Sequence, residues 1–507
     1  MKLDVTKNAK RSIAIGFLNK IIIMVLPFVI RSIINLTLGS EYLGLSSLFS
    51  SIIQVLSLTE LGFSSAMVYH MYKPIAENNQ DRINALLDLY KTAYRIIGII
   101  VLVIGGIITF FLPFLVKGSY PDGINIYLLF LMSVINTSIS YFLFGYKQSL
   151  LMAYQREDIN SIINLIVQLG MHTCQIAILL ITHNYYLFVL CMPIFTVFNN
   201  LWIGYLTKKL FPNAKAEGKL DKETLSEIKQ LVIGTFIQRA CGVTRNSLDS
   251  ICVSAFLGLT LTGIYNNYYV IFNGVTTVLG IIGVSLSGGI GNHVALKSID
   301  DNYEELKKLD FLYMNISGIS TVCLLCLYQP FMKLWMGEKM LLPFGAVVLM
   351  CIYFYILKMG DMKYLYNTAN GLWWKLKWRA IIETIANVVL NILLGKIWGV
   401  YGIVAATIIS LLTINFIWGT TILFKVYFRK EQLLSYYGYH LRYIVVTAII
   451  CVATYYITNV LISVNGAMID LMVKALLSVI ISLFLYGIIY FKTNIFRQSI
   501  RMIRRKR

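Results

Sequence analysis

The sequence predicts an all-α integral membrane protein with about fourteen transmembrane helices. We expect two pseudo-symmetric six-helix lobes, followed by two further C-terminal helices. Of the 507 residues, 58% are hydrophobic and 13% are charged, whereas a soluble domain carries about 25% charged residues. Long apolar runs recur along the chain, and the basic residues are concentrated in every second segment between them. These observations place the chain in the membrane class.

The expected helices follow from the bilayer, whose hydrocarbon core is crossed by about 20 apolar residues in a helix. Fourteen segments meet this requirement: 12–34, 42–69, 92–117, 124–146, 159–182, 185–206, 230–257, 263–291, 310–334, 343–369, 379–400, 402–424, 442–465 and 469–491. The first follows basic residues, as the apolar core of a secretory signal does. It contains Lys20 and Arg31 and lacks a small-residue cleavage site, so we expect it to be retained.

The distribution of charge predicts the orientation. The chain carries 44 Lys and Arg against 24 Asp and Glu, and 33 of the 44 basic residues lie at the two ends and in alternate loops. The other loops hold only four. Basic loops stay in the cytoplasm, so both termini are predicted to be cytoplasmic. We expect a multi-pass protein of the bacterial cytoplasmic (inner) membrane.

An internal repeat indicates the two lobes. Leu38-Gly39 followed by Gly44 recurs 219 residues later as Leu257-Gly258 followed by Gly263. Both copies start from the predicted cytoplasmic side, which is typical of parallel repeats. The predicted organisation is an N-terminal lobe at 1–210, a cytoplasmic inter-lobe loop at 211–229, a C-terminal lobe at 230–428, and two helices with a basic cytoplasmic tail at 429–507.

Ionisable residues inside the apolar runs are the candidate functional groups, because charges at membrane depth usually face a bundle interior or an aqueous cavity. Five bases form the predicted cationic cavity: Lys20, Arg31, Arg239, Arg245 and Lys358. Three acids are candidates for ion coupling or for salt bridges in the cavity: Glu60, Asp249 and Asp361. Others lie near predicted helix ends, where we expect them to reach the interface: Lys363, Lys474 and Glu383.

Helical spacing refines this set. Lys20 and Arg31 are eleven residues apart, about three turns, and so share one face. Asp249 follows Arg245 by one turn, and Asp361 follows Lys358 by one turn. The alternative to a functional role is that the two charges of each pair simply neutralise each other. Polar side chains at helical spacing predict further lining of the cavity: Asn164, Gln168, Asn266 and Asn273. For any single helix, hydrogen bonding to a neighbouring helix explains such a stripe equally well.

The residue types exclude several functions. The eight cysteines lie in apolar runs and the five histidines are scattered, so we expect no metal site, no cofactor and no catalytic residues. The basic residues sit where orientation in the bilayer is set, which argues against nucleic acid as a partner. Deep bases outnumber deep acids, so the predicted cargo is anionic.

Three groups of residues resemble the Wzx-type polysaccharide flippases. They are Leu38 to Leu45 (LGSEYLGL), Glu60-Leu61-Gly62-Phe63 with Tyr72-Lys73-Pro74, and Asp249 with Leu257-Gly258-Leu259, Gly263 to Tyr268 (GIYNNY) and Gly291-Asn292. The resemblance covers about residues 5–430 and includes the wider superfamily of multidrug extruders and lipid II flippases. It implies a multidrug-extruder-like fold with alternating access. It also implies that the five predicted cavity bases face the cargo.

The cargo implied by this resemblance is an oligosaccharide linked to undecaprenyl diphosphate, moved from the inner to the outer leaflet for surface polysaccharide synthesis. Polysaccharide polymerase and assembly proteins are candidate partners besides the lipid bilayer, and H⁺ or Na⁺ is the candidate coupling ion. The rival interpretations are a cation-coupled drug or small-molecule extruder, a lipid II flippase, a lipid scramblase, and a membrane-bound polysaccharide polymerase. The short predicted outer loops leave little room for a polymerase active site.

Overall fold

A computed structural model describes residues 22, 24–60, 63–118 and 120–505. Within these ranges it leaves undescribed the side chains of residues 59, 65, 234, 235, 238, 239, 246 and 503–505. Every regular element of the described residues is helical, so the predicted all-α class is confirmed. The chain forms two compact units, Met1–Gly263 and Ile264–Arg507.

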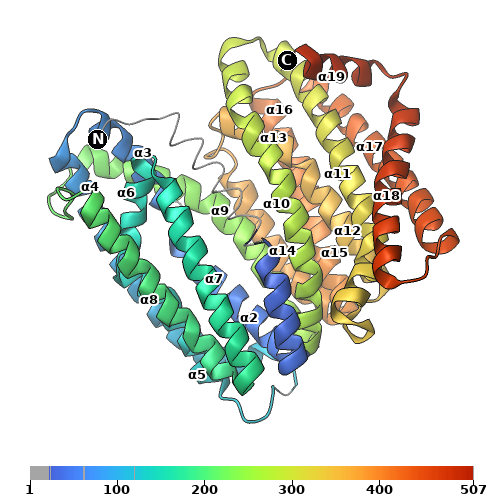
Figure 1. The fold of residues 1–507 in the computed structure, drawn as a ribbon. Helices are drawn as coiled ribbons and strands as arrows, with labels where there is room; N and C mark the ends of the chain where they lie inside the picture. The colour runs from blue at the N-terminus through green and yellow to red at the C-terminus, as the bar shows by residue number, and fades with distance from the viewer. Residues whose placement is uncertain (1–21, 23, 61–62, 119, 506–507) are drawn as a thin grey trace. The chain divides into compact units, whose positions relative to one another are not determined.

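The first unit contains the helix Met24–Thr37 and the helices that follow it along the chain. These are α2 (Ser40–Leu56), α3 (Phe63–Ala76), α4 (Gln80–Phe111), α5 (Ile126–Phe142), α6 (Gln148–Ala153), α7 (Glu157–Thr182), α8 (Tyr185–Leu210) and α9 (Lys222–Leu257). Short 3₁₀ turns join some of them: η1 (Ser57–Glu60), η2 (Leu112–Leu115) and η3 (Gly145–Lys147). In this unit α4 packs on α5, both α5 and α7 pack on α8, and α2 packs on α9 (Figure 1).

Helix α10 (Leu259–Leu296) begins in the first unit and continues into the second. The second unit also holds α11 (Ile299–Met336), the 3₁₀ turn η4 (Glu338–Met340), α12 (Phe344–Met359), α13 (Asp361–Ala369), α14 (Lys377–Trp398), α15 (Val400–Ser410), the π-helix η5 (Leu411–Trp418), α16 (Gly419–Val426), α17 (Glu431–Tyr455), the π-helix η6 (Tyr456–Leu461), α18 (Ala467–Tyr490) and α19 (Asn494–Arg505). Helix α11 is central here, since α12, α17, α18 and α19 all pack on it.

The described part of the chain has ten helices long and apolar enough to span a membrane, or eleven if the bent pair of Ile126–Phe142 and Gly145–Ala153 is one span. Three of the fourteen predicted spans are not among them. Segment 12–34 lies partly outside the described residues, 42–69 is interrupted by η1, and 230–257 falls within the charged helix α9. The chain is a multi-pass membrane protein, and the count of fourteen stays a prediction.

The repeated glycines occupy equivalent backbone positions. Gly39 has φ 102° and ψ 175° and precedes α2, while Gly258 has φ 93° and ψ 174° and precedes α10. A positive φ of this size favours glycine, because other residues are strained there. The later glycines of the repeat, Gly44 on α2 and Gly263 on α10, lie where these two helices touch. A Cβ on Gly44 would overlap the Leu259 carbonyl, and a Cβ on Gly263 would lie 2.8 Å from the Ser40 carbonyl oxygen.

This backbone contact has a consequence for the predicted lobes. It brings the start of α10 onto α2, and α9 packs on α2 as well. The first compact unit therefore includes α9, which the predicted organisation assigns to the C-terminal lobe at 230–428. The four predicted ranges stay a prediction.

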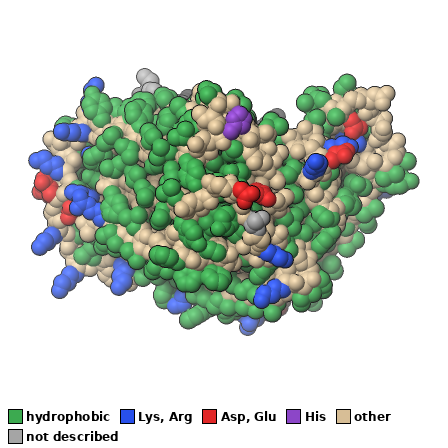
Figure 2. Space-filling model, turned by 90° about the horizontal axis from the view of Figure 1, so that it is seen from below, with side chains coloured by type: hydrophobic (Ala, Val, Ile, Leu, Met, Phe, Trp, Pro, Cys, Tyr) green, Lys and Arg blue, Asp and Glu red, His purple; other side chains and the backbone are tan. Residues whose placement is uncertain are grey.

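The outer faces of the helices are apolar. Phe110 is 78% exposed, Ile181 79% and Val284 76%. Hydrophobic side chains spread widely over the face shown in Figure 2, and the charged side chains occur on it in small, separate groups. Large exposed apolar surfaces are costly in water and are compatible with contact to lipid chains.

Candidate functional site

The predicted cationic residues are only partly described. Lys20 lies outside the described residues, and so does the side chain of Arg239 on α9. Arg31 lies on the helix Met24–Thr37 and donates from Nη1 to Ser47 Oγ at 3.2 Å and from Nη2 to the Gly263 carbonyl at 3.1 Å. Arg31 therefore joins the first described helix to α2 and to the start of α10, beside the contact of the repeated glycines.

Glu60 is the acid at the centre of a polar cluster in the first unit. It ends η1, and both of its carboxylate oxygens accept tyrosine hydroxyls: Tyr94 donates to Oε1 at 2.5 Å and Tyr141 to Oε2 at 2.8 Å. Tyr90 donates in turn to the Tyr94 hydroxyl at 2.9 Å. These tyrosines come from α4 and α5, so the carboxylate binds two neighbouring helices together.

A cavity of about 260 Å³ opens beside Glu60. Its lining is mostly polar: Glu60, Tyr94, Asn136, Thr137, Ser140, Tyr141, Gly145, Gln148 and Thr196. Across it Thr196 on α8 donates to Asn136 Oδ1 on α5 at 2.7 Å. A cavity of this size holds several waters. An acid that faces hydrating groups in this way is suited to binding a proton or a small cation.

The other predicted residues of the first unit lie on α7 and α9. Asn164 and Gln168 are half-buried on α7. On α9, Asp249 is buried and Arg245 is half-buried, and both take part in an interaction. In the second unit, Asn266 is half-buried and Asn273 is exposed, both on α10. Whether these side chains line one cavity with Arg31 stays a prediction.

Lys358 and Asp361 form an ion pair in the second unit. The Lys358 ammonium lies 2.9 Å from Asp361 Oδ2, which also accepts the Tyr313 hydroxyl at 2.5 Å. Lys358 is 3% exposed at the end of α12, and Tyr313 comes from α11. The ion pair that the one-turn spacing of Lys358 and Asp361 allows is therefore formed, and the Tyr313 hydroxyl links this pair to α11.

A second buried charge cluster was not predicted. On α14, Arg379 lies 2.6 Å from Glu383 Oε2, which also accepts from Asn415 Nδ2 at 2.9 Å. The Asn415 carbonyl accepts the Lys363 ammonium at 2.5 Å. Lys363 and Glu383 are each 4% exposed, so the expectation that they reach the interface is wrong.

The π-helix η5 explains how this cluster is satisfied. Asn415 lies inside η5, where the wider turn shifts the regular backbone hydrogen bonds. Its carbonyl accepts the Lys363 ammonium, while its side chain reaches Glu383 on the neighbouring helix. Such local departures from the α-helix recur at functional positions.

Asp310 and His440 form the third buried polar group. Asp310 Oδ2 accepts the Tyr436 hydroxyl at 2.5 Å and lies 3.2 Å from His440 Nε2. Asp310 is 2% and His440 1% exposed, between α11 and α17. Sequence reasoning missed them because it began the predicted spans at 310 and 442, whereas α11 begins at Ile299 and α17 at Glu431. The apolar runs alone do not show that these helices extend further.

No protein-family model and no curated protein matches this chain. Solved structures do resemble it. The lipid II flippase MurJ, in an inward closed conformation, matches with a TM-score of 0.69 at 13% identity, over 94% of this chain and 99% of that chain. An inward-facing multidrug resistance MATE family transporter of the MOP superfamily matches with a TM-score of 0.61 at 13% identity, over 78% of this chain and 93% of that chain.

An outward-facing structure of such a MATE transporter also matches, with a TM-score of 0.53 at 12% identity over 82% of this chain and 93% of that chain. At these identities the likeness concerns the fold. The chain has the fold of the MATE transporters and of MurJ, so the multidrug-extruder-like architecture predicted from the sequence is confirmed.

Proposed function

We propose that this chain is a flippase of the bacterial cytoplasmic membrane. Its cargo is an oligosaccharide linked to undecaprenyl diphosphate, moved from the inner to the outer leaflet for surface polysaccharide synthesis. The observation that carries the proposal is the excess of basic residues inside apolar segments, including Arg31, Arg245 and Lys358, in a chain with the fold of a lipid flippase. Both termini are cytoplasmic in this proposal, and polysaccharide assembly proteins are its partners.

The physical problem is the diphosphate. Carrying it bare through ~30 Å of hydrocarbon costs tens of kcal/mol. Guanidinium and ammonium groups replace its hydration, arginine by paired hydrogen bonds and lysine as a point charge. The lipid tail stays in the bilayer throughout. Each negative charge moved outward gains about 2.3 kcal/mol per 100 mV of membrane potential, inside negative, so the potential favours export.

A drug extruder is the second candidate, and the Glu60 cavity favours it. That cavity presents a carboxylate among polar side chains, which is the chemistry that binds cations. The fold is also that of multidrug MATE transporters. The flippase remains the better supported proposal because the bases inside the apolar segments outnumber the acids there.

Deleting the gene for this chain distinguishes the flippase from the drug extruder. In a strain without it, we expect lipid-linked oligosaccharide to accumulate on the cytoplasmic leaflet and surface polysaccharide to fall. Wild type should restore export, and Arg245→Gln should restore less than a tenth of it, because a charge-assisted contact to phosphate contributes about 1.5–3 kcal/mol. Lys339→Gln removes the same charge from the exposed turn η4 and should restore export fully.

Two results would contradict the flippase. One is normal surface polysaccharide in the strain without the chain, together with increased sensitivity to cationic drugs, which would establish the extruder. The other is accumulation of lipid II alone. Full rescue by Arg245→Gln would remove this arginine from the proposed mechanism.

We propose Glu60 as the coupling group. Glu60→Gln keeps an oxygen acceptor for one tyrosine hydroxyl but removes the charge and the proton-binding oxygen. We expect transport by purified chain in liposomes to become insensitive to collapse of the H⁺ and Na⁺ gradients at constant membrane potential, with a several-fold lower rate. Tyr141→Phe is the matched control, since it removes one hydrogen bond and leaves the carboxylate. Equal dependence of wild type and Glu60→Gln on the gradients would exclude Glu60 from coupling.

A further inference from the structure

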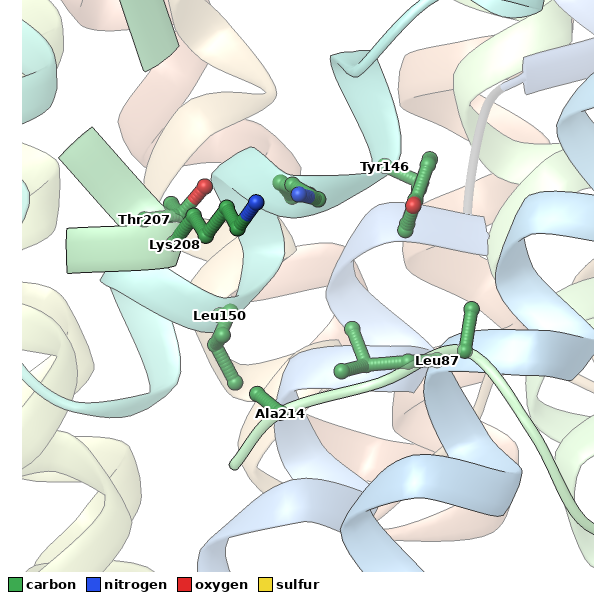
Figure 3. A pocket seen from close by; sticks show the side chains of 8 residues that line it. Leu87, Tyr146, Leu150, Thr207, Lys208 and Ala214 are labelled. Atoms are coloured by element: carbon green, nitrogen blue, oxygen red, sulfur yellow. The ribbon is translucent and has the colours of Figure 1, made fainter. Parts of the chain in front are cut away.

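A small basic pocket lies in the first unit, at its predicted cytoplasmic end. It has a volume of about 30 Å³ and is enclosed by α4, α8, the turn η3 with α6, and the loop after α8. Leu87, Leu150 and Ala214 form its apolar walls, and Lys208 is a charged residue that lines it (Figure 3). Lys147 is the second charged lining residue. The pocket therefore brings two ammonium groups from different helical segments to one opening.

The loop wall of this pocket is held in place by hydrogen bonds. The Lys215 backbone N–H donates to Asn84 Oδ1 on α4 at 2.9 Å, and Gln80 Nε2 donates to the same oxygen at 2.9 Å. At the start of the loop the Phe211 ring stacks on Tyr154 with a centroid distance of 4.4 Å. These contacts fix residues 211–215 against the helix ends, so the pocket is a built feature of the unit.

The far end of the loop is anchored as well. Arg82 Nη2 donates to Thr224 Oγ1 at 2.8 Å, and the Thr224 backbone N–H donates to Asp221, which caps α9. The Thr224 backbone N–H and hydroxyl both donate to the Asp221 carboxyl and hold its pKa below its usual value. The segment between Phe211 and α9 is thus tied to α4 at both ends.

Positive charge is concentrated at this pocket. Lys208 and Lys91 lie close enough to Lys147 for their charges to repel it. The Lys147 ammonium lies 4.8 Å from the centroid of the Phe144 ring. Among the ion pairs found in the described residues, none includes any of these three lysines. Asp88 is a carboxylate near enough to interact with Tyr146, another lining residue, but it appears in none of those ion pairs. The gathered ammonium groups repel one another, and a bound anion removes that cost.

We propose that Lys147 and Lys208 form a binding site for the phosphate of an anionic phospholipid of the inner leaflet. Basic pockets between transmembrane helices at the cytoplasmic side bind such headgroups. The pocket is small, about 30 Å³, and Lys208 is exposed, so the glycerol and acyl chains of the lipid remain outside it. This site does not rest on the proposed transport. It shares no lining residue with the Glu60 cavity, although the segment 145–148 contributes residues to both.

The test uses the purified full-length chain and native mass spectrometry with added phosphatidylglycerol or phosphatidylcholine. The variant Lys147→Gln/Lys208→Gln is expected to bind phosphatidylglycerol about thirtyfold more weakly at one site, from the contribution of each lysine near a headgroup. The control Lys209→Gln/Lys215→Gln removes the same charge from exposed positions nearby and should bind as wild type does. Lys208→Gln alone changes one exposed side chain and should give an intermediate loss without affecting the fold.

The remaining outcomes either support or overturn the lipid site. Displacement of phosphatidylglycerol by inorganic pyrophosphate in wild type, but not in the double variant, supports phosphate as the recognised group. An equal loss in the control pair overturns the site, because it would reflect the overall charge of the surface. Equal retention of phosphatidylcholine also overturns it. Binding of pyrophosphate without phosphatidylglycerol overturns the assignment to a lipid.

Discussion

Replacing Arg379 with methionine is expected to lower the free energy of unfolding by about 3–5 kcal/mol, because it leaves Glu383 charged and buried with a weaker partner. Arg379 lies 2.6 Å from Glu383 Oε2, and the two side chains are 10% and 5% exposed. Asn415 still donates to this carboxylate, but an amide carries no charge, and the Lys363 ammonium bonds the Asn415 carbonyl and is a less direct counter-charge than the guanidinium. The melting temperature and denaturant midpoint of the purified chain in detergent measure the loss.

The double variant Arg379→Met/Glu383→Leu shows whether the lost stability comes from leaving Glu383 as a buried charge without its partner. Replacing both partners of a buried ion pair by apolar groups is often neutral or stabilising, so we expect the double variant to recover most of the lost stability. The exposed pair Lys333–Glu338, 61% and 71% exposed, is the matched control. Lys333→Gln should change the melting temperature little, since exposed pairs contribute little. A double variant as unstable as Arg379→Met would show that the loss comes from packing instead.

Gly44→Ala is expected to destabilise the first unit by about 1–3 kcal/mol, the usual cost of overpacking. In a helix without neighbours the same change stabilises by about 0.5–1 kcal/mol, because glycine loses more backbone freedom on folding. At Gly44 the new methyl group meets the Leu259 carbonyl, which is backbone and cannot rotate away. The contact between α2 and the start of α10 must then open, and the hydrogen bond from Arg31 to the Gly263 carbonyl with it.

Gly106→Ala on α4 is the control, since a Cβ there meets nothing within 4 Å. The two alanines should therefore shift the melting temperature in opposite directions in the same assay. Gly44→Ala melting at or above the wild-type temperature would contradict the backbone contact between the repeated glycines. Gly263→Ala should resemble Gly44→Ala, because its Cβ would lie 2.8 Å from the Ser40 carbonyl oxygen.

Part of the candidate site was predictable from spacing along one helix or across one turn. Lys358 and Asp361 pair as their i,i+3 spacing allows, and Glu60 was identified as an acid inside an apolar run. The tyrosines that bind Glu60 lie 34 and 81 residues away in sequence, so no local pattern reveals them. Asp310 and His440 were missed because the predicted spans began at 310 and 442, whereas α11 and α17 begin earlier.

The sequence by itself determined that the chain crosses the membrane many times as helices, because hydrocarbon forces each crossing segment to be apolar and to satisfy its own backbone hydrogen bonds. It also determined where the backbone repeats, because the positive φ at Gly39 and Gly258 requires glycine. The tertiary structure alone decided which buried charges meet. A π-helix at Asn415 turns a carbonyl toward Lys363, and helices distant in sequence bring Asp310 to His440. Such pairings depend on the packing of whole helices, which apolar side chains of many kinds can achieve.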